Sequence, residues 1–188
     1  MENKVVEDKL YVNSQSLLED SFRLGKSIVE SGFRPDFLVG VWRGGSPVGI
    51  AVQEYLEFRS IKTDHIAIRT SGYSKDHKIE SKIRVHNLGY IEENINSKNK
   101  LLIIDDVFET GLTMESVIKN LKAKLKDKFP SEFKIATVYY KPDFNKTDLK
   151  PDFFVNITDK WIVFPHELVG LIDKELKEKG DWVNEFLK

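Results

Sequence analysis

Short runs of apolar residues alternate with amphipathic segments along most of this 188-residue chain. The runs at Phe37–Trp42 and 100–106 are typical of strands that are buried on both faces of a sheet. Segments 14–31 and 113–126 repeat apolar residues at helical spacing, so we expect an amphipathic helix at each. Strands that alternate with helices indicate an α/β fold with a mainly parallel, doubly wound sheet.

The remaining pattern completes the predicted sheet and its helices. We expect a helix that Ser46 caps and that has Pro47 at its first position, since both residue types favour these places. The polar stretch 70–84 is long for a connection within a compact domain, so we interpret it as a mobile, functional loop. Residues 166–179 are expected to be helical. Five more strands are expected, at 65–69, 83–88, 133–140, 153–157 and 161–164.

Two unusual loops of the predicted fold each follow a buried strand. One is Arg43-Gly44-Gly45-Ser46-Pro47, and the other continues from the strand that ends at Asp105 and Asp106. In a doubly wound sheet, ligands bind beyond the carboxyl ends of the strands. We therefore expect both loops at one edge of the sheet, and we interpret that edge as a binding site.

The second loop has the chemistry of a sugar phosphate site. Asp105 and Asp106 are adjacent carboxylates at a strand end, and such a pair suits the hydroxyl groups of a sugar or a hydrated magnesium ion. Thr110, Gly111 and Thr113 bring hydroxyl groups and accessible backbone to the start of a helix, where phosphate is favoured. A solvated acidic turn would explain two aspartates alone, but the Thr-Gly-x-Thr run is more specific.

Composition narrows the functions that this site can have. The formal net charge is -1, so no overall positive field attracts nucleic acid or an anionic membrane. The absence of cysteine excludes disulfides, thiolate metal sites and cysteine nucleophiles, and none of the four histidines has the spacing of zinc ligands. Residues 1–9 lack the apolar core of a signal peptide, and no apolar run is long enough to span a membrane. We therefore expect a cytoplasmic protein.

The acidic loop resembles the signature of the type I phosphoribosyltransferases. In that signature a hydrophobic strand is followed by two acidic residues, two variable positions, a third acidic residue and Thr-Gly-x-Thr, as in residues 104–113. Three other segments resemble, in order, parts of the purine enzymes of this family. They are Val-Trp-Arg-Gly-Gly at 41–45, the pyrophosphate loop; Tyr-Lys-Pro at 140–142, which recognises the base; and Trp-Ile-Val-Phe-Pro at 161–165, which stacks on it.

The resemblance implies a magnesium-dependent enzyme of purine salvage. Such an enzyme transfers the phosphoribosyl group of 5-phosphoribosyl-1-pyrophosphate to hypoxanthine, guanine or xanthine and releases pyrophosphate. It also implies a single domain over residues 1–188, in which 142–188 contribute to base recognition, and a homodimer or homotetramer. The stretch 70–84 corresponds in position to the family's flexible hood, although Gly72 separates Ser71 from Tyr73 where relatives have a Ser-Tyr pair.

The resemblance also assigns the residues that bind the donor sugar. Asp105 and Asp106 would hold the ribose hydroxyls, directly or through metal-bound water, and would favour the positive charge that develops on the ribose ring. Arg43 and Gly44 would hold the pyrophosphate, and by similarity the peptide bond before Gly44 is expected to be strained or cis. The 5-phosphate would be held by Thr110, Gly111, Leu112 and Thr113.

Base recognition would fall to residues on later segments. Lys141 would donate to the 6-oxygen and so reject adenine, and Trp161 or Ile162 would cover the face of the base. Glu167 would assist a second magnesium ion. Glu109 stands where most relatives have aspartate acting on N7 of the purine, and we hypothesise that it still serves the base although its carboxylate is one methylene farther from the backbone.

Three alternatives use the same residues differently. A transferase for orotate or uracil would need no lysine for the 6-oxygen. A regulator that senses phosphoribosyl pyrophosphate and binds RNA or DNA would explain Glu109, but the chain has no evident basic stripe interleaved with aromatic residues. A phosphoacceptor receiver domain would place its aspartate pair after the first strand, whereas here a Gly-rich strand–loop–helix unit comes first.

Overall fold

The computed structural model describes residues 3–72 and 83–187. The chain divides into two compact units. We call Asp20–Asp159 the central unit, and Met1–Glu19 together with Lys160–Lys188 the terminal unit. The predicted mobile loop falls largely on residues 73–82, which lie outside the described part of the chain.

A six-stranded sheet forms the middle of the central unit, with the strand order β5-β4-β3-β6-β7-β8. All neighbouring strands are parallel except β4 and β5, which pair antiparallel. This topology confirms the prediction of an α/β fold with a mainly parallel, doubly wound sheet. The strands are β3 (Phe37–Trp42), β4 (Asp64–Gly72), β5 (Ile83–His86), β6 (Lys100–Phe108), β7 (Glu132–Tyr140) and β8 (Phe153–Ile157).

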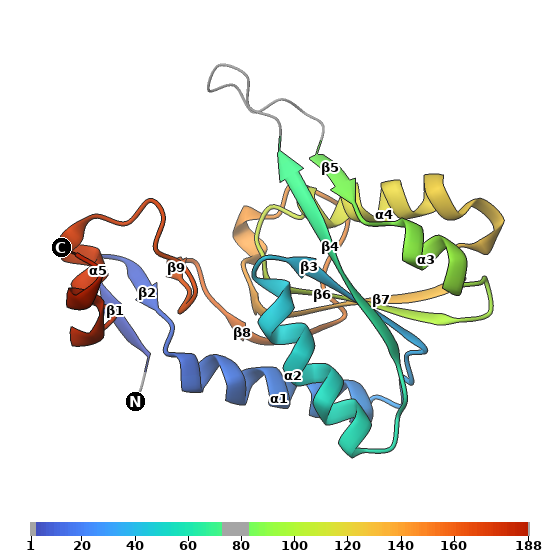
Figure 1. Cartoon of the computed structure of the whole chain (residues 1–188), viewed down its shortest axis with the longest axis horizontal. Coiled ribbons are helices and arrows are strands. Elements are labelled where there is room, and N and C mark those ends of the chain that lie inside the picture. The colour runs from blue at the N-terminus through green and yellow to red at the C-terminus, as the bar shows by residue number, and fades with distance from the viewer. Residues whose placement is uncertain (1–2, 73–82, 188) are drawn as a thin grey trace. The chain divides into compact units, whose positions relative to one another are not determined.

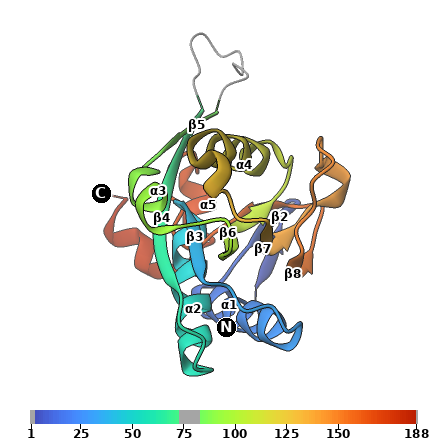
Figure 2. The ribbon, with the colours of Figure 1, turned by 90° about the vertical axis from the view of Figure 1, so that its right-hand side faces the viewer.

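Helices cover both faces of this sheet. Figures 1 and 2 show α2 and the part of α1 that belongs to the central unit on one face, and α3 and α4 on the other. The helices are α1 (Ser14–Glu30), α2 (Gly45–Phe58), α3 (Gly89–Asn94) and α4 (Leu112–Leu125), and short 3-10 turns follow at Lys126–Lys128 and Pro142–Phe144. None of the helices in the described ranges is long and apolar enough to cross a membrane.

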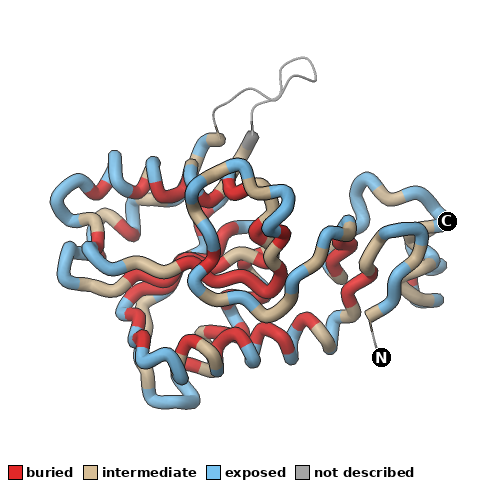
Figure 3. The backbone as a smooth tube through the Cα atoms, turned by 180° about the vertical axis from the view of Figure 1, so that it is seen from behind, coloured by how far each residue is buried: buried red, intermediate tan, exposed pale blue. Residues whose placement is uncertain are grey.

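The core of the central unit explains why the apolar runs form strands. Ile103 and Ile104, which are neighbours on β6, are both fully buried, so this strand packs against helices on each face of the sheet. Figure 3 shows the same arrangement, with buried residues along the strands and on the inner sides of the helices. The rigid layer that results places the carboxyl ends of β3, β6 and β7 at one edge.

A second, three-stranded sheet forms the terminal unit. It consists of β1 (Lys4–Val6), β2 (Lys9–Tyr11) and β9 (Trp161–Val163), in which β1 pairs antiparallel and β9 parallel with β2. The short helix α5 (Asp173–Lys177) and a 3-10 turn at Asp181–Glu185 complete the unit. The sheet joins segments about 150 residues apart in the chain.

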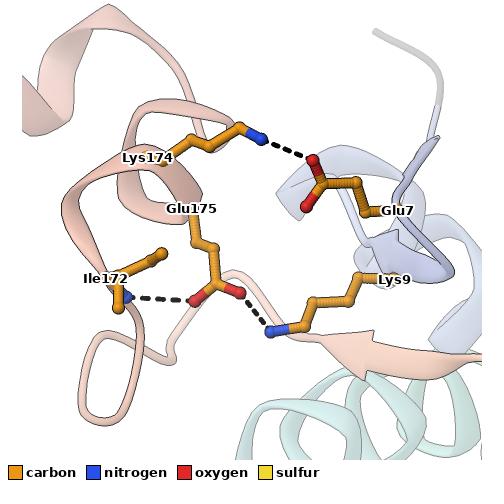
Figure 4. A network of polar contacts seen from close by, with 5 residues as sticks. All are labelled: Glu7, Lys9, Ile172, Lys174 and Glu175. Carbon is orange, nitrogen blue, oxygen red and sulfur yellow. Dashed lines mark hydrogen bonds and ion pairs between the residues drawn. The ribbon is translucent and has the colours of Figure 1, made fainter.

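Ion pairs connect α5 to β2 and to the turn between β1 and β2 (Figure 4). Lys9 pairs with Glu175, and Lys174 pairs with Glu7. Glu175 also accepts a hydrogen bond from the backbone N–H of Ile172 at 3.0 Å. The hydrogen bond to Lys9 lowers the pKa of Glu175, and the same bond raises the pKa of Lys9.

Several predicted boundaries are wrong. The stretch 70–84 is not all loop, because β4 continues to Gly72 and β5 begins at Ile83. The helix expected at 166–179 is limited to α5, and Gly170, with a φ of 88°, interrupts the segment before it. Ser46 does not cap α2, since that helix already begins at Gly45.

Candidate active site

The two loops singled out in the sequence meet at the carboxyl edge of the central sheet. One follows β3 and contains Arg43 and Gly44; the other follows β6 and contains Glu109. The sequence predicted that β6 ends at Asp106, but the strand continues to Phe108, which pairs with Tyr140 of β7. Asp105 and Asp106 therefore lie within a paired strand, where hydrogen bonds to β7 fix their backbone.

The backbone of the first loop lies directly against the two aspartates. A β-carbon at Gly44 would be 1.8 Å from Oδ2 of Asp106, and one at Gly45 would be 2.4 Å from the carbonyl oxygen of Ile104. Both distances are far shorter than any real contact. At Gly45 the obstacle is backbone, so only glycine fits there, whereas a side chain at Gly44 would displace the carboxylate of Asp106. The two glycines thus have a steric cause: they let the loop approach the acidic pair.

The acidic pair is electrostatically crowded. Burial raises the pKa of the Asp105 carboxyl well above its ordinary value, and the negative charge of Asp106 raises it further. A hydrogen bond from the backbone N–H of Gly45 acts in the opposite direction. Each carboxylate also accepts a backbone N–H at the strand end, Asp105 from Asp106 at 3.0 Å and Asp106 from Val107 at 2.8 Å. A cation or a set of hydroxyl donors would relieve this crowding.

The carboxylates of Asp105 and Asp106 suit a magnesium ion, which takes only some of its ligands from the protein. They are too few for a metal whose ligands all come from protein side chains. Magnesium is usually held by one or two carboxylates together with water and substrate phosphates, which matches the pair Asp105 and Asp106. Among residues 3–72 and 83–187, no cluster of three or more His, Asp or Glu side chains is arranged to hold a metal. The arrangement therefore suits an ion that takes its remaining ligands from a substrate.

Arg43 is exposed at the start of the first loop. The peptide bond that joins it to Trp42 is cis, whereas the sequence comparison pointed to the bond before Gly44, one residue later. The carbonyl oxygen of Arg43 accepts the backbone N–H of Ser46 at 3.1 Å, which closes the loop into the first turn of α2.

The second loop turns into α4 through Gly111. Its φ of 77° is left-handed, a conformation that favours glycine, and α4 begins at the next residue. Thr110 Oγ1 accepts a hydrogen bond from the backbone N–H of Leu112 at 3.4 Å, and the Leu112 side chain is exposed. Thr113 follows within the first turn of the helix. The predicted phosphate residues are thus gathered at the positive end of a fourteen-residue helix.

Glu109 and Lys141 form an ion pair across the ends of β6 and β7. Oε1 of Glu109 lies 2.9 Å from Nζ of Lys141. The Lys141 side chain is only 3% exposed, whereas that of Glu109 is 38% exposed. The carboxylate of Glu109 is therefore partly exposed to solvent, whereas the ammonium group of Lys141 is almost completely buried.

Phe144, which the sequence analysis did not single out, lies beside this pair. Nζ of Lys141 is 4.4 Å from the centre of the Phe144 ring, a cation–π distance. The backbone N–H of Lys141 also donates to the carbonyl oxygen of Phe108 at 2.9 Å. The only signal in the sequence is an aromatic residue three positions after the lysine, and that spacing has no general meaning.

The remaining predicted site residues belong to the terminal unit. Trp161 is 61% exposed and so is free of core packing, whereas Ile162 is 8% exposed and forms part of that unit's interior. Of the two candidates for covering a base, Trp161 alone presents an open aromatic face. The Glu167 carboxylate accepts the backbone N–H of Phe164 at 3.1 Å, a structural role within its own turn.

Known proteins resemble this chain over most of its length. In structure it is similar to a purine phosphoribosyltransferase from Pyrococcus horikoshii, with 29% sequence identity, a TM-score of 0.66, and coverage of 88% of this chain and 99% of that one. A Neisseria gonorrhoeae hypothetical protein crystallised with bound ppGpp gives a TM-score of 0.72 at 20% identity, covering 92% of this chain and 96% of that one.

A third similar structure is a Helicobacter pylori xanthine-guanine-hypoxanthine phosphoribosyltransferase, with a TM-score of 0.61 at 24% identity and coverage of 83% of this chain and 91% of that one. At these two lower identities the likeness shows the fold alone. No curated protein sequence matches this chain. The profile of the phosphoribosyl transferase domain matches residues 10–169. This match confirms the resemblance noted in the sequence, and the chain belongs to the phosphoribosyl transferase domain family.

Proposed function

We propose that this protein transfers the phosphoribosyl group of 5-phosphoribosyl-1-pyrophosphate to a 6-oxopurine. The observation that carries the proposal is the ion pair between Glu109 and Lys141, 2.9 Å apart at the edge of the sheet. It places a hydrogen-bond acceptor next to a hydrogen-bond donor, about as far apart as two neighbouring polar atoms on one edge of a base.

A 6-oxopurine offers the complementary pattern. Its 6-oxygen accepts hydrogen bonds, and in the free base the neighbouring N7 can carry a proton and donate. Lys141 therefore suits the 6-oxygen, and the carboxylate of Glu109 suits N7–H. Adenine has an amino group at the 6-position, which would meet the ammonium group of Lys141 donor to donor. A site of this kind rejects the mismatched base because a buried polar group is left unpaired.

The acidic pair and the two loops fit the donor sugar. Arg43, with its planar guanidinium, and the close-approaching backbone at Gly44 suit the pyrophosphate, and the start of α4 suits the 5-phosphate. Asp105 and Asp106 would hold the ribose hydroxyls and the magnesium ion, which when bound supplies positive charge beside the leaving group. Their own negative charge would stabilise the cationic ribose of the transition state.

The chemistry then requires few groups from the protein. A bond forms between the base nitrogen and the anomeric carbon while the bond from that carbon to the pyrophosphate oxygen breaks. The proton that the base loses passes to Glu109, whose carboxylate is partly exposed. The family resemblance assigns the stacking on the base to Trp161.

An assay with four bases tests this proposal. The protein is incubated with 5-phosphoribosyl-1-pyrophosphate, magnesium and hypoxanthine, guanine, xanthine or adenine in turn, and nucleotide and pyrophosphate are measured together. We expect both products with at least one 6-oxopurine and a kcat/KM for adenine that is lower by about 100-fold or more. Turnover of adenine at an equal rate would contradict the proposed preference for 6-oxopurines. No product from any of the four bases would contradict the proposal as a whole and favour the sensor interpretation.

A further inference from the structure

The segment that follows Lys141 contacts residues 110–113, which we call the phosphate loop. The backbone N–H of Lys146 donates to the carbonyl oxygen of Thr110 at 3.0 Å. A β-carbon at Gly111 would lie 2.3 Å from Oγ1 of Thr147 and 2.8 Å from Oδ1 of Asn145. The polar side chains of this segment therefore lie directly against the residue that turns the loop into α4.

These side chains are held by hydrogen bonds within their own turn. Oδ1 of Asn145 accepts both the backbone N–H and the hydroxyl of Thr147, each at 3.0 Å. The hydroxyl of Thr147 in turn accepts the N–H of Leu149 at 3.3 Å, and Nδ2 of Asn145 donates to the carbonyl oxygen of Leu149 at 2.7 Å. We call residues 145–149 the Asn145 turn.

The Asn145 turn is anchored at both ends. Leu149 packs against the hydrophobic core of the central unit. Four residues before the turn, Lys141 is fixed by Glu109 and by the carbonyl oxygen of Phe108, and the backbone N–H of Asn145 donates to the carbonyl oxygen of Pro142 at 3.2 Å. The turn is therefore built on rigid structure and can fix the position of a neighbouring loop.

We propose that the Asn145 turn positions the phosphate loop, with Thr147 as its central positioning residue. The hydrogen bond from Lys146 to Thr110 and the close approach of Thr147 to Gly111 both come from this turn. Backbone N–H groups bind phosphate well only when they converge on one point, so a small displacement of Gly111 weakens binding. The proposal rests on the proposed function in one respect, that the loop binds a phosphate.

It follows that one segment, residues 141–149, positions groups for both base recognition and phosphate recognition. The same segment carries Lys141 at its start and the Thr147 contact six residues later. Thr147 reaches the phosphate loop through Gly111, whereas neither Arg43 nor Gly44 of the pyrophosphate loop contacts the turn in the hydrogen bonds and glycine contacts described above. A change at Thr147 should therefore affect the 5-phosphate more than the pyrophosphate.

The test compares three single variants. Thr147→Val keeps the shape of the side chain but removes the hydroxyl, and Thr147→Ser restores the hydroxyl. Thr63→Val is the matched control, because the Thr63 hydroxyl is buried without a hydrogen-bond partner and lies before β4, away from the turn. Affinity for ribose 5-phosphate and for inorganic pyrophosphate is measured by calorimetry, with thermal melts to check folding.

We expect Thr147→Val to weaken ribose 5-phosphate binding about tenfold and to leave pyrophosphate binding within about twofold. Thr147→Ser and Thr63→Val should bind both ligands about as the unaltered protein does. In the assay, Thr147→Val should raise the KM for the donor sugar more than the KM for the base. Should Thr147→Val fail to fold, Asn145→Ala gives the same comparison, because it removes the acceptor that holds Thr147.

Two failures are distinguishable. If the unaltered protein binds ribose 5-phosphate and Thr147→Val binds it equally well, or loses both ligands alike, the positioning role is wrong and the proposed function stands. If the unaltered protein does not bind ribose 5-phosphate at all, the proposed function is wrong, and the positioning role falls with it.

Discussion

The two halves of the site differ in which charged groups lie side by side. At the β3–β6 edge, the carboxylates of Asp105 and Asp106 lie side by side, and burial together with the negative charge of Asp106 raises the pKa of Asp105. At the β6–β7 edge, the carboxylate of Glu109 already has the ammonium group of Lys141 as its partner. The first half places two carboxylates side by side, whereas the second places a carboxylate beside an ammonium group.

This difference assigns the halves to different tasks. A crowded acidic pair favours whatever brings positive charge, which suits a metal-bound donor sugar and a cationic transition state. A preformed donor and acceptor at fixed spacing suit discrimination between bases, because their geometry is set in advance. We therefore expect substitutions in the first half to affect mainly the rate, and substitutions in the second to affect mainly the choice of base.

The largest effect should come from the acidic pair. Asp106→Asn keeps the shape and the acceptor for Val107 N–H but removes a negative charge from the ribose site, so kcat/KM should fall by about 100- to 1,000-fold for every base alike. Steady-state kinetics with each base measures this. Asp127→Asn, at an exposed position in the turn after α4, is the control and should leave kcat/KM unchanged. A selective loss for one base would contradict the division of tasks.

The ion pair should show a smaller but base-dependent effect. Lys141→Gln and Glu109→Gln should each lower kcat/KM for hypoxanthine about 10- to 100-fold and narrow the preference over adenine. Because the two residues act as one unit, the double variant should lose little more than the worse single variant. The exposed pair Lys26 and Glu30 supplies a matched double variant that should not alter selectivity. Additive losses would show that the two side chains act separately.

The sequence predicted the sheet well where local pattern decides the structure. The strands β3 and β8 have the bounds expected from their apolar runs. The last two residues of β6, Val107 and Phe108, were missed because the two aspartates suggested the end of the strand, and the extension beyond them depends on pairing with β7. The strands β1 and β2 are three residues long and form a sheet with β9, so no local pattern could have revealed them.

The same reasoning separates what could be foreseen in the site from what could not. Residue types and spacing were enough to select Asp105, Asp106 and Lys141, because those positions match a family signature. The pairing of Glu109 with Lys141 and the contact of Thr147 with Gly111 join residues more than 30 positions apart. Such contacts follow from the parallel alignment of strand ends, and only the folded chain reveals them.

A third prediction concerns Trp161, the residue proposed to stack on the base. Trp161→Leu removes the exposed indole and should raise the KM for hypoxanthine about tenfold while leaving the KM for the donor sugar within about twofold. Kinetics with each substrate varied in turn measures the two constants. Trp182→Leu, another partly exposed tryptophan of the terminal unit, is the control. An equal rise in both constants would indicate a structural effect rather than stacking.

The smallest effect should be one of stability. Because the pKa of Asp105 is raised in the folded state, protonation favours folding, so the free energy of unfolding falls as pH rises from the ordinary aspartate value of 3.8 through the raised pKa. Asp105→Asn removes this dependence and should raise the free energy of unfolding at neutral pH while abolishing most activity. Denaturant unfolding of the unaltered protein and of the variant between about pH 4 and about pH 8 measures the free energy of unfolding and its dependence on pH. A variant that is less stable at neutral pH would contradict the crowding at the acidic pair.

The central claim is that the acidic pair holds the donor sugar while Glu109 and Lys141 read the base. A crystal structure of the protein with magnesium, hypoxanthine and an unreactive analogue of 5-phosphoribosyl-1-pyrophosphate tests it most directly. The account predicts the 6-oxygen within about 3 Å of Lys141 Nζ, N7 within about 3 Å of Glu109, and the ribose hydroxyls beside Asp105 and Asp106. Density for the base away from Lys141, or for the sugar away from the aspartates, would contradict it.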